Sequence, residues 1–352
     1  MRKQWSTSRM LLIILGVMIL LIGGCTMQKT ATSKMVSYTN PLSDDGGSYS
    51  DPWLIRIGKH YYYCGSDGKG KIIVKQSTDP TTILESADKV VYESPATGPY
   101  STELWAPEMH YLAGHWYIYV AADDGENANH RMYALVGGTN AKDPLDGKFT
   151  FKGKVADNTD RWAIDGTVLT LKDKLYFIWS GWSGTENVAQ NLYIAPMSNP
   201  YTINDTINGP RVLISAPTES WERHGQPYVN EGPEILTHGN QINLIYSASG
   251  SWTDDYCLGQ LSLTGKDPLK ASAWQKKKQP VFKKTDKVFG PGHGSFITSP
   301  DGTSWIMYHA AKVKGSGWDR DIRLQSFSWH DDETPAFGKP VAPDTKLEYP
   351  LN

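Results

Sequence analysis

Five titratable residues recur at nearly regular intervals along this chain of 352 residues: Asp51, Glu108, Asp165, Glu231 and His293. Successive members are 57, 57, 66 and 62 residues apart. Two carboxyl groups facing each other across a cleft are the minimum for glycoside hydrolysis, because one protonates the leaving oxygen while the other activates water or attacks the sugar. A third acid nearby can keep the proton donor protonated near neutral pH. The recurring acids therefore raise the question of whether the fold brings them together.

Each of these residues stands at the start of a similar unit, in which an apolar strand, a turn and an aromatic strand ending in small residues follow one another. Helical periodicity is nearly absent, and the recurrence predicts radial repetition of a strand-turn-strand unit. Five units closing into a β-propeller would remove exposed edge strands. A β-sandwich or jelly roll is the alternative, but it gives no reason for the recurrence. The units lie at 50–66, 106–123, 163–181, 230–250 and 292–311.

In a five-bladed β-propeller the innermost strands run along a central channel, so equivalent residues of the repeats converge at one end of it. Bringing acids together near an apolar core costs free energy through repulsion and desolvation, and a structural repeat has no need of them there. The sequence therefore predicts an all-β, five-bladed propeller with an active site at one end of the channel.

The composition narrows the classes of function. The chain has 13 Trp and 19 Tyr against 8 Phe, and flat amphipathic rings suit both sugar binding and sheet cores. Its formal net charge of −2, without a basic stripe, argues against nucleic acid as a partner. No serine-hydrolase elbow, P-loop or dinucleotide glycine motif is present.

The N-terminal sequence is typical of an export signal. Basic residues precede an apolar run at 10–22, and the run ends in Gly23-Gly24-Cys25. This pattern resembles a lipoprotein signal (1–24) that is cut before a lipidated Cys25, followed by a flexible tether (25–40) and the propeller domain (41–352). An uncleaved transmembrane anchor is the alternative. Either interpretation places the domain outside the cytoplasm, attached to a membrane or secreted.

Six short motifs, in order, resemble glycoside hydrolase family 43, which comprises five-bladed propeller arabinofuranosidases, arabinanases and β-xylosidases. They are SDPWLIRIGKHYYYCGS, ELWAPEMHYLAGHWYIYVAA, AIDGTVL, VNEGPEIL, GPGHGSF and WHDDETPAFGKPVAP. The resemblance implies that Asp51 is the general base, that Asp165 orients the acid and tunes its pKa, and that Glu231 is the general acid. It also implies inversion, which requires roughly 6.5 to 9.5 Å between base and acid.

Two further acids and a histidine are harder to assign. Glu234 lies three residues after Glu231, an offset that points to the other face of a regular strand, so we expect it to be non-catalytic. We do not expect Glu108 to transfer a proton in the reaction. His293 is interpreted as a catalytic base, a metal ligand or a packed core histidine. The family resemblance places it in the channel, often beside calcium or another hydrated ion, although calcium prefers oxygen ligands.

Arg323 matches an arginine that members of the family use near the sugar, with a surface ion pair to Asp321 or Asp319 as the alternative. Trp105 is the first candidate for stacking on a sugar and Trp162 the second. Packing in a blade core is the alternative for both, as it is for Trp53 and Trp221.

Within the family, the Glu-Gly-Pro motif and the short segment after WHDDETPAFGKP favour the single-domain α-L-arabinofuranosidases. The expected activity is release of terminal α-L-arabinofuranose from arabinan or arabinoxylan, with no cofactor required and at most a structural calcium ion. The alternatives are a β-xylosidase, an endo-arabinanase or a non-catalytic carbohydrate-binding propeller. Cys64 and Cys257 are expected to be buried thiols or a disulfide.

Overall fold

Short apolar and aromatic runs separated by glycine, aspartate and asparagine fold into antiparallel strands along nearly the whole described chain. The computed structural model describes residues 34–43, 47, 49–204, 209 and 211–352, which lie in one unit, Ser33–Asn352. Helical turns in these ranges are short, at η1 (Pro80–Glu85), η2 (Asn127–Asn129), η3 (Ser220–Glu222) and η4 (Ala271–Ala273).

Five groups of strands follow one another in sequence, and each is a blade in which neighbouring strands pair antiparallel. Blade 1 contains β2 (Trp53–Ile57), β3 (His60–Ser66), β4 (Lys71–Ser77) and β5 (Lys89–Glu93). Blade 2 contains β6 (Thr102–Leu112), β7 (His115–Asp123), β8 (Arg131–Val136) and β9 (Thr150–Val155).

The remaining three blades repeat this order. Blade 3 contains β10 (Ala163–Leu171), β11 (Lys174–Trp182), β12 (Ala189–Asn199), β13 (Thr202–Ile203) and β14 (Val212–Ser215). Blade 4 contains β15 (Tyr228–His238), β16 (Gln241–Ala248), β17 (Cys257–Leu263) and β18 (Trp274–Lys276). Blade 5 contains β19 (Phe289–Thr298), β20 (Ser304–Ala311), β21 (Arg320–Trp329) and β22 (Pro335–Ala336).

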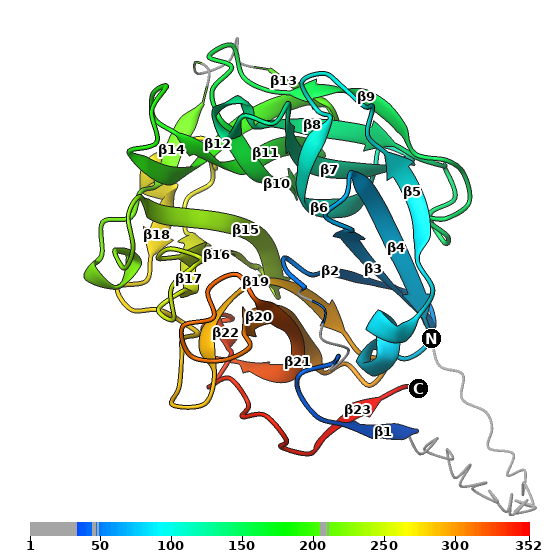
Figure 1. Ribbon diagram of the computed structural model, residues 1–352. Helices are drawn as coiled ribbons and strands as arrows, with labels where there is room; N and C mark the ends of the chain where they lie inside the picture. The colour runs from blue at the N-terminus through cyan, green and yellow to red at the C-terminus, as the bar shows by residue number, and fades with distance from the viewer. Residues whose placement is uncertain (1–33, 44–46, 48, 205–208, 210) are drawn as a thin grey trace, which may run out of the picture. The chain divides into compact units, whose positions relative to one another are not determined.

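The first strand of every blade lies nearest the common axis (Figure 1). These strands contact one another in a closed cycle, β2 to β6, β10, β15, β19 and back to β2. A short parallel pairing of β12 with β15 also joins blades 3 and 4. The predicted five-bladed β-propeller is confirmed.

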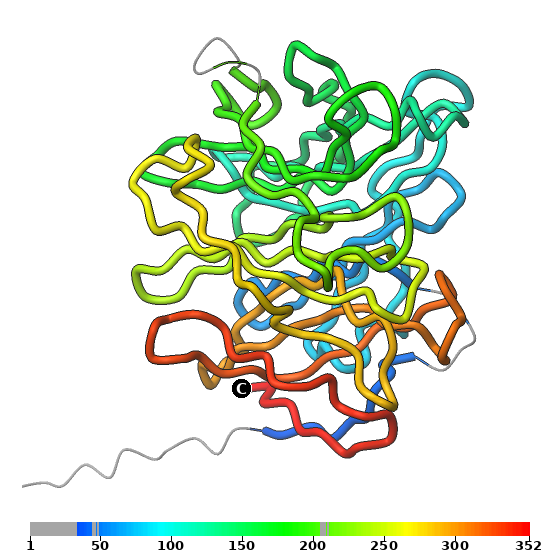
Figure 2. The backbone as a smooth tube through the Cα atoms, turned by 90° about the vertical axis from the view of Figure 1, so that its left-hand side faces the viewer, coloured from blue at the N-terminus to red at the C-terminus, as the bar shows by residue number. Residues whose placement is uncertain are grey.

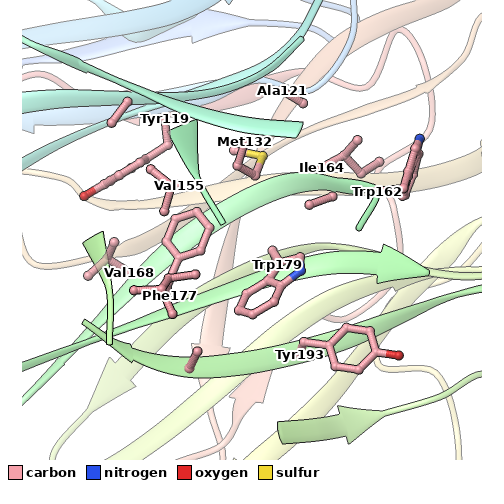
Figure 3. Packing of buried hydrophobic residues seen from close by; sticks show 14 of the residues in the cluster. Tyr119, Ala121, Met132, Val155, Trp162, Ile164, Val168, Phe177, Trp179 and Tyr193 are labelled. Carbon is pink, nitrogen blue, oxygen red and sulfur yellow. The ribbon is translucent and has the colours of Figure 1, made fainter. Parts of the chain in front are cut away.

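Apolar side chains fill the space between adjacent blades. One cluster joins blades 2 and 3, where Tyr119 and Met132 pack with Phe177 and Trp179 (Figure 3). Equivalent clusters lie between blades 1 and 2, 3 and 4, 4 and 5, and 5 and 1. Because burial of apolar surface is the main favourable term in folding, these five clusters hold the ring together.

A β-bulge near the start of the innermost strands sets the direction of the functional side chains. In β10 and β15 one extra residue interrupts the pairing with the next strand. β6 and β19 each have two such bulges, and the second of them occupies the equivalent place. The bulge places a residue at positive φ, and Asp51 has the same backbone conformation just before β2. Bulges of this kind re-aim side chains beside active sites. The φ values are 51° at Asp51, 43° at Ala106, 53° at Asp165, 52° at Gly232 and 46° at His293.

This register corrects the alignment of the repeats. The structural counterparts of Asp51, Asp165 and His293 in the other two blades are Ala106 and Gly232. Glu231 therefore lies one residue before the repeated position, and Glu108 lies two residues after it. The acids still gather in one region, but from neighbouring positions along the bulge.

The chain ends of the described unit lie side by side. β1 (Met35–Tyr38) pairs with β23 (Leu347–Pro350), as the blue and red segments in Figure 2 show. The expected tether at 25–40 is therefore too long, since β1 and the buried Asn40 belong to the folded unit. The reason is a pairing with the distant C-terminal strand, which local sequence does not reveal.

The expected signal (1–24) and Cys25 lie outside the described residues. No helix within the described ranges is long and apolar enough to cross a membrane. Cys64 in β3 and Cys257 in β17 are both buried and free, so of the two expectations for this pair the thiols are the correct one.

Candidate active site

Asp51 precedes β2 and is surrounded by residues of blade 5, the neighbour that closes the ring. Its Oδ1 lies 3.1 Å from Nδ1 of His293, 3.3 Å from Nδ1 of His309 and 3.8 Å from Nη1 of Arg320. The Asp51 backbone N–H also donates to Nδ1 of His309 at 3.1 Å. The Asp51 side chain remains 26% exposed, so water can reach this carboxylate.

These contacts fix the ionisation of Asp51. Burial alone would raise its pKa, but the charge of His293 and the hydrogen bond from that imidazole hold the pKa well below the usual aspartate value. Burial and the nearby Arg320 lower the pKa of His309 to about 3, so this imidazole is neutral. Asp51 is therefore an ionised carboxylate with access to water, as a general base must be.

Asp165 in β10 and Glu231 in β15 meet through the backbone of blade 4. Oδ2 of Asp165 accepts a hydrogen bond from the N–H of Gly232 at 2.9 Å. Oε1 of Glu231 accepts one from the hydroxyl of Tyr256 at 2.8 Å. Both carboxyl groups are buried. Asp165 thus anchors the residue next to Glu231, while Tyr256 holds the Glu231 side chain itself.

The environment gives Glu231 the opposite protonation state to Asp51. Burial, followed by the charge of Asp165, raises the pKa of Glu231 to about 7. Burial also raises the pKa of Asp165 to about 6, against the opposing charge of His293. For His293, burial favours the neutral form, but Asp51 and Asp165 raise its pKa to about 10. His293 is therefore a cation among the acids, and Glu231 keeps its proton near neutral pH.

A second pair of acids lies next to this site. Glu108 and Glu234 line a small cavity of about 10 Å³ together with Asp51 and His293, and Glu108 also contacts Nε2 of His110 at 2.9 Å. Burial and the neighbouring Glu108 raise the pKa of Glu234 well above its usual value. The expectation that Glu234 points to the opposite face is wrong, because the bulge between Glu231 and Glu234 breaks the regular alternation.

The two tryptophans expected to stack on sugar differ in their surroundings. Trp105 is partly buried, its ring stacks on His130 with centroids 3.9 Å apart, and its Nε1 donates to Glu103 at 2.9 Å. Trp162 is only 3% exposed in the core between blades 2 and 3 (Figure 3). Its ring stacks on that of Trp182. The structure thus contradicts the stacking role for Trp162, because protein covers its ring faces.

Arg323 is fully buried and forms a two-pronged pair with Asp321, at 2.8 and 3.1 Å. The partner is the one expected in the ion-pair alternative, but the pair is buried and not at the surface, and the described contacts of Arg323 do not include the three acids. Arg320, three residues earlier in β21, lies beside Asp51 instead and also donates through Nη2 to the carbonyl of Ser251 at 2.6 Å. The arginine at the site is therefore Arg320.

The contacts of His293 leave one ring nitrogen for a cation. Its Nδ1 faces Asp51, so only Nε2 of a neutral imidazole could bind a metal ion. Across the described ranges no three His, Cys, Asp or Glu side chains are grouped to hold a metal ion. Calcium would also need a shell of oxygen ligands.

Sequence reasoning missed three residues that touch the proposed acid and base: Tyr256, His309 and Arg320. His309 carried a signal, since it pairs opposite Gly292 at the position where other blades have Ala121, Ser180 and Ser247. A large titratable side chain replaces small ones there. The other two carried no signal, because each reaches the site from a loop or strand end set by tertiary structure.

A buried polar network holds the strand that carries Glu231. Asn230 donates to Oε1 of Glu222 at 3.0 Å and accepts from Ser215 at 2.7 Å. Glu222, fully buried, also accepts from Tyr246 at 2.8 Å and pairs with Lys276 at 2.7 Å. The residue before Glu231 is therefore fixed from several directions.

An ionised and a protonated carboxyl group, at the channel end of a five-bladed propeller, define the acid–base site of a glycoside hydrolase. A family model described as glycosyl hydrolases family 43 matches residues 38–335, and the chain belongs to that family.

Named relatives and a solved structure agree with this membership. A Streptomyces avermitilis protein named extracellular exo-α-(1→5)-L-arabinofuranosidase is 36% identical over 96% of this chain and 70% of its own length. A Humicola insolens protein named α-L-arabinofuranosidase 43 is 34% identical over 88% of this chain and 65% of its own length. The crystal structure of an α-L-arabinofuranosidase from Lactobacillus brevis superimposes with a TM-score of 0.77, at 31% identity, covering 88% of this chain and 98% of that one.

Proposed function

We propose that this protein is an inverting α-L-arabinofuranosidase that removes terminal units from α-1,5-linked arabinan or its oligosaccharides. The observation that carries the proposal is the opposite ionisation of Asp51 and Glu231 in one site. The names of its relatives from two Streptomyces species, both extracellular exo-α-(1→5)-L-arabinofuranosidases, support the sugar and the linkage.

In the proposed mechanism, Asp51 removes a proton from a water molecule that attacks the anomeric carbon of the terminal sugar. Glu231 donates its proton to the glycosidic oxygen as the bond from that oxygen to the anomeric carbon breaks. The attack comes from the face opposite the leaving group, so the configuration is inverted. At the end of the cycle Asp51 holds a proton and Glu231 is ionised, and exchange with water restores both.

The neighbouring residues act on these two groups. Asp165 raises the pKa of Glu231 by its charge and fixes the adjacent Gly232 N–H. His293 keeps Asp51 ionised. We propose that no cofactor is needed, since this set already supplies a base, an acid and a compensating cation.

The proposal is tested by comparing an aryl α-L-arabinofuranoside, an aryl β-D-xyloside and α-1,5-arabinotriose as substrates for the wild type and for Glu231→Ala. The wild type is expected to prefer both arabinosides. Glu231→Ala is expected to lose activity on arabinotriose by about 10² to 10⁴, but to keep more of it on an activated aryl substrate, whose leaving group departs without protonation. Cleavage of the xyloside alone would refute the assigned sugar.

We also propose that the protein is exported and attached to a membrane through a lipid on Cys25. The basic and apolar N-terminal sequence that ends in Cys25 supports lipidation at that cysteine. Metabolic labelling with a radioactive fatty acid is expected to mark the wild type and not Cys25→Ala. Equal labelling of the two would exclude Cys25 as the lipid-bearing residue.

A further inference from the structure

Two tryptophans form an exposed aromatic platform between blades 4 and 5. Trp318, in the loop between β20 and β21, is 63% exposed. Its ring meets the half-buried Trp252, in the loop between β16 and β17, edge to face, with centroids 6.1 Å apart and planes at 73°. Leaving so large an apolar ring in water forgoes the free energy that burial would contribute.

Contacts between the two loops hold the platform in place. Nε1 of Trp318 donates to the hydroxyl of Ser251 at 3.1 Å. The carboxylate of Asp254 accepts from the N–H of Gly315 at 2.8 Å. Trp252 in turn packs so closely over Gly250 that a Cβ there would lie 2.6 Å from the indole ring. The exposed ring is therefore positioned before any ligand arrives.

A chain of polar contacts connects the platform to the proposed active site. Ser251, which binds the Trp318 indole, offers its carbonyl to Nη2 of Arg320 at 2.6 Å. Nη1 of the same arginine lies 3.8 Å from Asp51. Two residues thus link the aromatic surface to the proposed general base.

The position of the platform also indicates which part of a substrate it would meet. The glycosidic oxygen must lie next to the proton donor, Glu231, which blade 4 carries. Tyr256, the partner of Glu231, lies at the end of the same loop as Trp252. The leaving group therefore lies on the side of blade 4, whose β16–β17 loop carries Trp252.

We propose that Trp318 and Trp252 form a binding subsite for the leaving-group side of an α-1,5-linked arabinose chain, an inference that rests on the proposed function. One face of a pentose ring carries C–H groups, which pack on the flat apolar face of an indole. The subsite would bind units beyond the one released, so it would favour oligosaccharides and polysaccharide over the shortest substrate.

The experiment measures kcat/KM on α-1,5-arabinobiose and on α-1,5-arabinotetraose. The wild type is expected to prefer the tetraose, and Trp318→Ala to lower the tetraose-to-biose ratio about tenfold, equivalent to about 1.4 kcal/mol. Trp318→Phe keeps a flat ring and is expected to retain most of the preference. Val313→Ala is the control, since Val313 is 64% exposed in the same loop, and it is expected to leave the ratio unchanged.

An unchanged ratio in Trp318→Ala would overturn the subsite. An equal loss on both substrates, with no recovery in Trp318→Phe, would overturn it as well and indicate a structural role. Failure of the wild type to cleave either oligosaccharide would instead refute the proposed function, so the two failures are distinguishable.

Discussion

Asp51 and Glu231 are carboxyl groups of the same channel end, yet their surroundings give them different protonation states. Asp51 touches two imidazoles and retains contact with water, whereas Glu231 is buried beside the acid Asp165. The order of the motifs and the spacing of the repeats predicted which acids come together. The protonation states depend on burial and on His293 and Asp165, which reach Asp51 and Glu231 from other blades, so they could not be predicted from local sequence.

The dependence of kcat/KM on pH tests this difference. Because Glu231 must be protonated, kcat/KM on arabinotriose is expected to fall as pH rises through about 7. Because Asp51 must be ionised, the acidic limb is expected only below the usual aspartate range. In Glu231→Ala with an activated aryl substrate the alkaline limb is expected to disappear. Its persistence there would show that another group is the acid.

Tyr256→Phe tests how the acid is positioned. The hydroxyl of Tyr256 lowers the pKa of Glu231 by hydrogen bonding, so its loss is expected to move the alkaline limb to higher pH. Loss of a bond to a group that becomes charged is expected to lower kcat about tenfold. Tyr308→Phe is the control, since this buried hydroxyl binds Gln325 instead. A lower kcat with an unmoved limb would contradict the assigned contact.

At the scale of elements, β-bulges decide where the acids point. The sequence repeats predicted five strand-turn-strand units, and each has an innermost strand close to its expected place. The predicted alignment of the acids was wrong by one or two residues. The reason is that a bulge adds a residue without any local sequence marker shared by all five units. Proline follows the residue at positive φ in blades 1, 2 and 4, whereas Gly166 and Gly294 follow it in the other two. The predicted orientation of the Glu234 side chain was wrong for the same reason.

The network behind β15 supports the strand that carries the acid. Glu222→Ala is expected to destabilise the fold by roughly 3–5 kcal/mol, because it leaves Lys276 partly buried without its partner. Urea denaturation measures this change. Glu186→Ala, at an exposed position, is the control and is expected to change stability by less than about 0.5 kcal/mol. Similar stabilities for the two variants would show that the network is not structural.

At the scale of the whole molecule, the N-terminal segment closes the ring and delivers Asp51. Asn40 donates to the carbonyl of Leu324 and accepts from its N–H, both at 2.9 Å. The chain then follows blade 5, where the Tyr49 N–H bonds the Arg320 carbonyl. Sequence periodicity predicted the number of blades, but not this closure, because Asn40 and Leu324 are 284 residues apart.

Asn40→Ala tests the closure. It removes the Asn40 acceptor from the buried N–H of Leu324 and one of the two donors to the Leu324 carbonyl, which keeps the hydroxyl of Tyr38. The expected loss is roughly 1–3 kcal/mol, for the N–H that loses its partner. A lower Tm and a lower kcat are both expected, since the segment that ends in Asp51 loses its anchor. Asn240→Ala, at an exposed position, is the control. Unchanged stability would indicate that β1 and β23 suffice to close the unit.

The central claim is that Asp51 activates water while Glu231 protonates the leaving oxygen on the opposite side of the sugar. The most direct measurement is proton NMR of the first arabinofuranose released from α-1,5-arabinotriose, recorded before mutarotation. The β-anomer is expected to form first, because water attacks from the face opposite the leaving group. Initial release of the α-anomer would show a covalent intermediate and would contradict the account.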